Sequence, residues 1–297
     1  MSAWREFLFR SIFGLFIFQG VDANEVWMHS SVYIPEISEG YLITQVGQGQ
    51  QSWREAPGVL PARMKISGNG DESLLLACSN GLQLSYKGNG SLAFERFEQR
   101  VSDGNLRGLS RSILSMDTGT LEIDCRSIAG GSQVLLELPI GSILMYDTLG
   151  SVVLEYDIYR RVYRFALHCA QGSLELTDLS GEHYSIETDQ AITGAGSSIN
   201  PSLEISDLDE RMSGRLGAFV LRCRDELSEV DENPQEWLSQ MSIISMMQDR
   251  VLRDDFVLRT NPEGKQPYII ELSFRPRLFI PRYGVSRALS EDDEELY

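Results

Sequence analysis

Short apolar runs fill the chain between about residues 24 and 196, and they constrain the fold more than any other feature. Each run is rich in valine, isoleucine, leucine, tyrosine or phenylalanine, and turn residues separate it from the next. No helix-length segment lies between the runs, which argues against a parallel α/β sheet. The pattern predicts a mostly β fold, either an antiparallel sandwich or a solenoid. Examples are "GYLITQVG", "SLLLACS", "LQLSYK", "QVLLELPIG" and "VYRFALHC".

Residues 168–190, "HCAQGSLELTDLSGEHYSIETDQ", contain two of the three histidines in the chain. The runs on both sides of "DLSG" alternate apolar and polar residues, and this period of two predicts a β-hairpin with Leu176 and Ile186 facing inward. His183 falls on the polar side, and His168 alternates away from the neighbouring leucine. A zinc site needs three or four convergent ligands. The pattern therefore favours a structural hairpin over a metal or catalytic site.

The hydrophobic period changes after Ser206 and becomes helical. We expect Ser206 to cap the helix, with Asp209 as an acid in the first turn. Gly214 and Gly217 either weaken this helix or allow close packing. The predicted apolar stripe consists of Leu208, Met212, Leu216, Phe219, Cys223 and Leu227.

A second helix is predicted to follow, with Asn233 as its cap and Pro234 at its first position. Together the two helices predict an αα-hairpin that packs on the β-domain. The methionine-rich stripe of the second helix also fits a partner-binding face, although core packing is the more frequent use. This stripe consists of Trp237, Met241, Ile244, Met247 and Val251.

The N-terminus resembles a signal peptide. Arg5 and Arg10 precede the apolar run "SIFGLFIFQG". This run of about ten residues is too short to span a bilayer. Small residues at 21–23 predict cleavage after Ala23, so the mature protein would start at Asn24 in the periplasm or outside the cell. An uncleaved anchor or a buried helix is the alternative interpretation. After cleavage we expect no integral membrane segment.

These patterns together predict five segments along the chain. They are a signal peptide (1–23), a β-domain (24–200), a two-helix segment (201–254), a hairpin or extended arm (255–285) and an acidic tail (286–297).

The four cysteines are never spaced as C-x-x-C, which argues against a zinc site. In an exported protein two interpretations of the cysteines are possible: buried free thiols or one disulfide. A disulfide would add little to a core of this size. The cysteines are Cys78, Cys125, Cys169 and Cys223.

Charge and motifs narrow the functional classes. The net charge of −17 disfavours binding to nucleic acid and to anionic lipid. No nucleophile elbow, zinc-protease motif, Walker loop or EF-hand loop occurs. Asp147, Glu155 and Asp157 lie close together, but such spacing is more typical of a solvated face than of a catalytic pair. We therefore expect a non-enzymatic protein with no catalytic, cofactor-binding or metal-binding residues and no cofactor.

Residues 40–196 resemble the FecR-domain family. The resemblance rests on "ESLLLACSNGLQLSYKGNGSLAFERFEQ", "LSMDTGTLEID", "LELPIGSILMYDTLGSVVLEYD" and "YRFALHCAQGSLELTDLSGEHYSIETDQAI", in the family's order and near-family spacing. One departure is that Tyr146, Asp147 and Thr148 stand where the family usually has Arg-Gly-Thr. The regulators that name the family carry an anti-sigma region and a membrane helix before this domain. Only a signal-like segment precedes the matching residues here, so the resemblance implies a stand-alone FecR-like domain without the anti-sigma region.

The sequence favours a non-enzymatic exported protein that binds a protein or glycan at the cell envelope. The alternatives are an extracellular polysaccharide hydrolase and a regulatory domain that contacts an outer-membrane receptor.

Overall fold

The computed structural model describes part of the chain between residues 26 and 227. The predicted signal peptide, the second helix, the extended arm and the acidic tail lie outside the described residues. The described ranges are 26–37, 40–45, 52–53, 58–61, 63–68, 70–101, 108–196 and 201–227.

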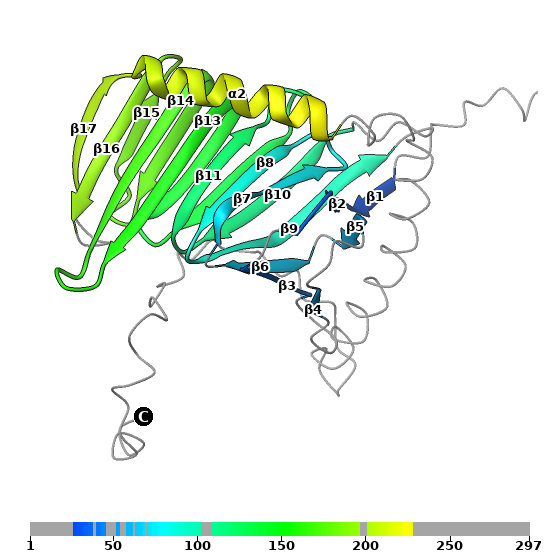
Figure 1. The fold of residues 1–297 in the computed structure, drawn as a ribbon. Coiled ribbons are helices and arrows are strands. Elements are labelled where there is room, and N and C mark those ends of the chain that lie inside the picture. Colours follow the sequence, from blue (N-terminus) through cyan, green and yellow to red (C-terminus); the bar gives the residue numbers. More distant parts are fainter. Residues whose placement is uncertain are drawn as a thin grey trace, which may run out of the picture.

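Two long antiparallel strands, β13 (Gly141–Asp157) and β14 (Val162–Asp178), run through the whole sheet (Figure 1). The first half of β13 pairs with β12 (Gln133–Leu138), whereas its second half pairs with β11 (Gly119–Asp124). In the same way, the first half of β14 pairs with β16 (Gln190–Gly196) and the second half with β15 (His183–Ile186). The sheet therefore divides into two leaves that share these long strands.

The remaining strands extend each leaf. The first leaf contains β11, β2 (Ser31–Ile34), β5 (Gly58–Pro61), β7 (Gly70–Cys78), β8 (Gln83–Gly88), β16 (Gln190–Gly196) and β17 (Pro201–Asp207). The second leaf contains β12, β1 (Val26–His29), β3 (Tyr41–Gln45), β4 (Ser52–Trp53), β6 (Met64–Gly68), β9 (Ser91–Val101), β10 (Ser110–Met116) and β15 (His183–Ile186).

The predicted mostly β, antiparallel class is confirmed. Among the described strands the only parallel pairing joins β10 to β12. The strands form a curled half-barrel sheet and not the repeated parallel coils of the solenoid alternative (Figure 1).

One hydrophobic core lies between the two leaves. Alternate residues of each strand point inward, as the period of two in the sequence predicts. Leu84, Tyr86 and Ile123 contribute from the first leaf, and Leu136 and Leu176 from the second, all at most 1% exposed. Both leaves thus bury their inner faces against each other.

The long strand β13 changes neighbours at a bulge formed by Tyr146, Asp147 and Thr148. Asp147 has a φ of 47°, which is the left-handed region. The buried Thr148 hydroxyl donates to the carbonyl of Ser173 at 2.7 Å, and its N–H lies 3.1 Å from Cys125 Sγ. Residues 146–148 therefore form the bend between the leaves.

A buried polar network at the β7–β8 turn also ties the leaves together. Asn80 is completely buried, and its amide donates to the hydroxyls of Ser110 and Ser112 in β10, at 3.0 and 3.2 Å. The neighbouring Ser79 hydroxyl donates to Gln99 of β9 at 2.6 Å. Because buried polar groups are costly when unpaired, this network favours one relative position of the leaves.

Helix α2 (Glu210–Glu226) follows the sheet and corrects two predictions. The N-cap is Asp209, whose side chain accepts from the N–H of Arg211. Ser206 is not a cap, because it lies in β17 and pairs with Ala191. The first residues of the predicted two-helix segment, 201–207, form strand β17 and not a helix.

The apolar stripe of α2 is confirmed from Met212 onward, because Met212 packs half-buried on the sheet and Leu216, Phe219, Cys223 and the capping Leu227 are buried. Leu208 lies before the N-cap and is not part of the helix. No second helix forms an αα-hairpin with α2 in the described part of the chain. Within that part, no helix combines the length and apolar character needed to cross a membrane.

The hairpin of residues 168–190 is confirmed. Leu176 pairs with Tyr184 across the ladder, and Thr177 pairs with His183. Leu176 and Ile186 are buried, whereas His183 is exposed.

We predict that the apolar residues of this hairpin, and not its exposed histidine, stabilise the fold. Leu176→Ala and Ile186→Ala should each lower the free energy of unfolding by about 2–5 kcal/mol, since each leaves a cavity in the core. His183→Ala, the control, should stay within about 0.5 kcal/mol of wild type. Denaturant unfolding measures all three. A larger loss for His183→Ala than for Leu176→Ala would contradict the structural role of the hairpin.

A second prediction compares two glycines that both face open space. Gly217 lies inside α2 with no atom within 4 Å of an added Cβ, so the close-packing interpretation is wrong, and Gly217→Ala should stabilise by about 0.5–1 kcal/mol. Gly181 has equal space but a φ of 90° in the "DLSG" turn. Gly181→Ala should therefore destabilise, by about 1–2 kcal/mol. Equal effects in denaturant unfolding would show that backbone conformation does not decide the sign.

Candidate functional site

Helix α2 lies across the outer face of the first leaf (Figure 1). Leu216, Phe219 and Cys223 pack there on a second, smaller apolar cluster that includes Leu75 of β7 and Leu149 of β13. These strand residues alternate with core residues, so they point to the opposite side of the sheet. Apolar residues on this outer face therefore fix where the helix sits.

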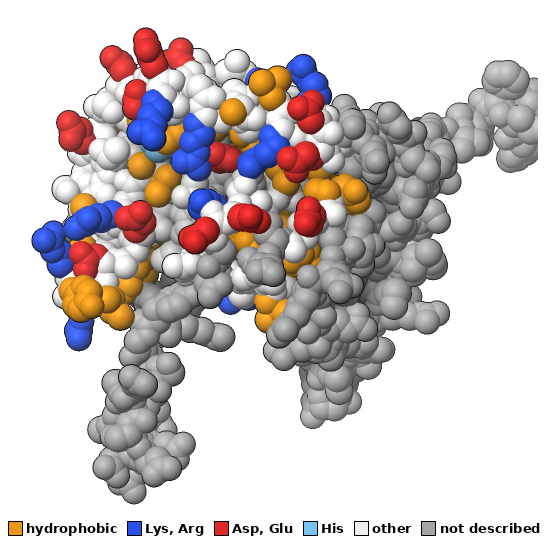
Figure 2. Space-filling view, viewed as in Figure 1, with side chains coloured by type: hydrophobic (Ala, Val, Ile, Leu, Met, Phe, Trp, Pro, Cys, Tyr) orange, Lys and Arg blue, Asp and Glu red, His pale blue; other side chains and the backbone are white. Residues whose placement is uncertain are grey.

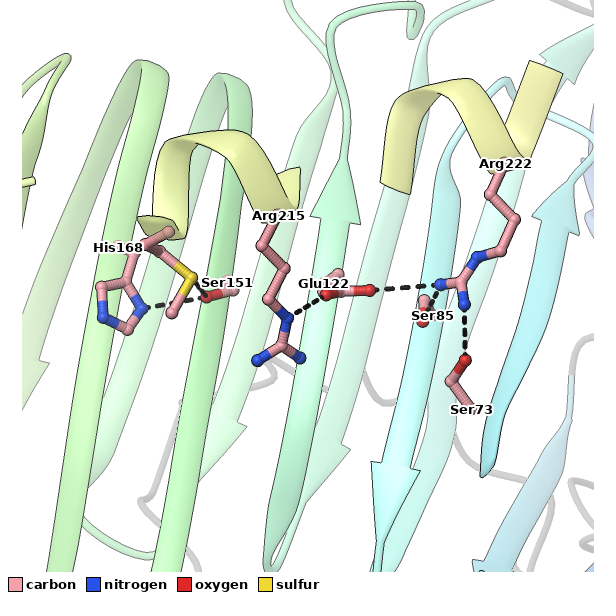
Figure 3. Close-up of polar contacts among 8 residues, drawn as sticks. Ser73, Ser85, Glu122, Ser151, His168, Arg215 and Arg222 are labelled. Atoms are coloured by element: carbon pink, nitrogen blue, oxygen red, sulfur yellow. Dashed lines mark hydrogen bonds and ion pairs between the residues drawn. The ribbon is translucent and has the colours of Figure 1, made fainter. Parts of the chain in front are cut away.

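A buried carboxylate on β11 joins the helix to the sheet. The side chain of Glu122 is only 7% exposed, and it lies between two arginines of α2 (Figure 3). Arg215 Nε donates to Glu122 Oε1 at 2.7 Å, and Arg222 lies 3.3 Å from Oε2. The arginines are seven residues apart and therefore on the same helix face. Because a buried charge must be paired, Glu122 favours this placement of α2.

Arg222 also reaches two strands beyond β11. Its guanidinium donates to the hydroxyl of Ser73 at 2.7 Å and to that of Ser85 at 2.8 Å (Figure 3). Its Nε atom is buried without a hydrogen-bond partner in the described structure. The arginine therefore keeps one donor that no described group uses.

A cavity of about 480 Å³ opens between α2 and the strands β7, β8 and β11. Figure 2 shows basic and acidic side chains gathered on this face, over α2 and the strands beside it. Most of the residues that line the cavity are polar, and they include three cationic side chains and one carboxylate. The lining residues are Ser73, Ser85, Lys87, Thr120, Glu122, Arg215, Ala218, Phe219 and Arg222.

His168 lies beside the cavity, near the start of the helix. Its Nδ1 atom is 2.9 Å from the hydroxyl of Ser151, which also contacts the sulfur of Met212 (Figure 3). Burial lowers the pKa of His168, and the positive charge of Arg215 lowers it further, against the opposing effect of Asp209. The imidazole is therefore neutral at pH 7 and acts as a packing and hydrogen-bonding group.

The other residues considered in the sequence do not converge. His183 lies in the second leaf, where its Nδ1 atom is 2.9 Å from the hydroxyl of Thr177. Asp147 sits in the bulge, and Asp157 pairs with Arg164 near the far end of β13. Hydrogen bonding from the N–H of Arg160 lowers the pKa of Asp157, which does not suit a proton donor. In the described part of the chain, no three His, Cys, Asp or Glu residues form a metal-binding group.

All four cysteines are buried and free, so of the two possibilities left open the structure shows buried thiols. Burial raises the pKa of the Cys125 and Cys169 thiols to about 11 and that of Cys223 to about 12. Such thiols are protonated at neutral pH and are weak nucleophiles.

The sequence did not reveal the cavity. Glu122 stands in "TLEID", where alternation with Leu121 and Ile123 predicts an exposed polar residue. The only available signal was the spacing of Arg215 and Arg222 beside the apolar stripe of a helix expected to pack on the β-domain. That spacing does not say which strand the helix covers.

We predict that Glu122 stabilises the docking of α2. Glu122→Ala removes the anion that two partly buried arginines share and should cost about 1–3 kcal/mol, less than the loss of a fully buried pair because both arginines are partly solvated. Glu155→Gln, at an exposed position on β13, is the control and should change stability by less than about 0.5 kcal/mol. Denaturant unfolding monitors both variants. If Glu122→Ala is as stable as Glu155→Gln, the carboxylate does not hold the helix.

Comparison with known proteins gives a partial likeness only. No protein-family model matches the chain, and no curated protein matches it. Two solved structures, both reported as a "putative anti-sigma factor" from Parabacteroides distasonis, are similar to part of it. Identity is 11% in both cases, and the TM-scores are 0.37 and 0.38. Each match covers 50% of this chain, which spans about 61% of the length of those chains.

Proposed function

We propose that this chain is a non-enzymatic, exported FecR-like domain protein that binds a protein or glycan at the cell envelope. The observation that carries the proposal is the open cavity between α2 and the first leaf, where several charged and hydroxyl side chains converge. Polar groups that converge in a concave site are typical of ligand binding. Export rests on the signal-like N-terminal sequence, and the FecR-like assignment rests on the sequence resemblance.

The composition of the cavity supports binding over hydrolysis. Glycoside hydrolysis generally uses a pair of carboxyl groups, one of which donates a proton. Glu122 is the only carboxylate among the described residues that line the cavity. Both of its oxygens are already paired with arginines that hold the helix, and the described wall offers no second carboxyl group for such a pair.

The framework around the cavity also suits a binding module. The strands that form its floor are held by the core, and α2 is held by an apolar cluster and by Glu122. A site built on such elements is preorganised, so a ligand does not have to order it. We therefore expect binding with little change in the fold.

The test uses the purified chain, an array of envelope glycans and an envelope protein fraction, with assays of binding and of glycan turnover. We expect saturable binding without turnover. Ala218→Leu, at an exposed position of α2 on the cavity wall, should fill the cavity and weaken binding, because leucine maintains the helix. Leu221→Ala, at an exposed position of the same helix that does not line the cavity, should leave binding unchanged. Turnover that Glu122→Gln abolishes would contradict the proposal and support the hydrolase alternative.

A further inference from the structure

The cavity beneath α2 carries an excess of positive charge, although the chain as a whole has a net charge of −17. Lys87, Arg215 and Arg222 line it, and Glu122 is the only anion among the described lining residues. Three cations and one carboxylate leave two positive charges on the wall. Such a local excess in an acidic protein attracts an anion and repels a cation.

Lys87 is the cation that the fold does not explain. It lies on β8 and is exposed, and its side chain has no hydrogen bond or ion pair in the described structure. Arg215 and Arg222 hold the helix through Glu122, so the structure accounts for them without a ligand. Lys87 contributes nothing of that kind, yet its side chain lines the same cavity.

Arg215 keeps donors for a ligand, whereas Arg222 contributes its charge. Arg215 uses Nε for Glu122 and is 45% exposed, and no group in the described structure accepts from its terminal nitrogens. The terminal nitrogens of Arg222 already bind Ser73, Ser85 and Glu122, and its Nε is buried. Guanidinium groups bind carboxylates and phosphates through paired hydrogen bonds, and an ammonium group adds a point charge. These are the groups that recognise an oxyanion.

The remaining wall fits a hydroxyl-bearing ligand. The hydroxyls of Ser73 and Ser85 accept from Arg222 and still have a proton to donate, and Thr120 adds a third hydroxyl. Ala218 is the small residue on the helix between the two arginines, and it leaves the mouth of the cavity open. A volume of about 480 Å³ lies within the usual range for small-molecule sites.

We propose that this cavity is an oxyanion site, which binds the carboxylate or phosphate group of an acidic saccharide through Lys87, Arg215 and Arg222. This inference rests on the proposed binding function and names its ligand class. The oxyanion sits against the three cations and the sugar hydroxyls face the serine and threonine side chains.

Isothermal titration of the full chain with glucuronate, glucose and inorganic phosphate tests the inference. Glucuronate and glucose differ by one carboxylate, so we expect glucuronate to bind and glucose to bind at least about tenfold more weakly, the effect of one charge-assisted contact. Raising the salt concentration should weaken glucuronate binding. Phosphate should compete with glucuronate, and the relative affinities show whether the sugar adds to recognition of the anion.

Lys87→Gln should weaken glucuronate binding about fivefold to tenfold without changing the unfolding midpoint, since the Lys87 side chain has no polar partner in the described structure. The matched control is Lys65→Gln, a lysine on β6 that does not line the cavity, and it should bind like wild type. Equal binding of glucose and glucuronate, no binding of either anion, or unchanged affinity in Lys87→Gln would overturn the inference. In those cases the proposed binding function would still stand if another envelope ligand bound the wild-type chain and Ala218→Leu blocked that binding.

Discussion

The sharing of β13 and β14 between both leaves is the constraint on which the rest of the structure depends. A strand that pairs with β12 and then with β11 must bend, and the bulge at Tyr146–Thr148 provides that bend. The Thr148 hydroxyl donates to a carbonyl there, so the bend does not leave this buried group unpaired. Because the leaves then face each other, one core can be enclosed by a single curled sheet.

The bend also determines what covers the outer face of the first leaf. Leu75, Ala77 and Leu149 point away from the core, and water would surround them without another element. Helix α2 buries them, and Glu122 pairs with its two arginines. The same contacts leave a hollow over β7, β8 and β11, so the candidate site is a consequence of how the helix is docked.

Local patterns predicted much of this fold. Alternation identified the inward residues of the hairpin, such as Leu176 and Ile186. Ser206 was misassigned because a polar residue before a helical stripe resembles a cap, whereas strand pairing with Ala191 decides its conformation. The cavity could not be predicted, because it unites residues 73–122 of the sheet with 215–222 of the helix. That contact depends on tertiary packing, and the periodicity of a single segment does not predict which segments pack together.

We propose that α2 and the first leaf together form a cationic cavity that receives an oxyanion. NMR observation of arginine Nε–Hε signals during titration with glucuronate tests this most directly. We expect the signals of Arg215 and Arg222 to shift together and to saturate with one affinity, while that of Arg160, which is 72% exposed at the β13–β14 turn, stays unchanged. Shifts of equal size at Arg160, or none at Arg215 and Arg222, would contradict it.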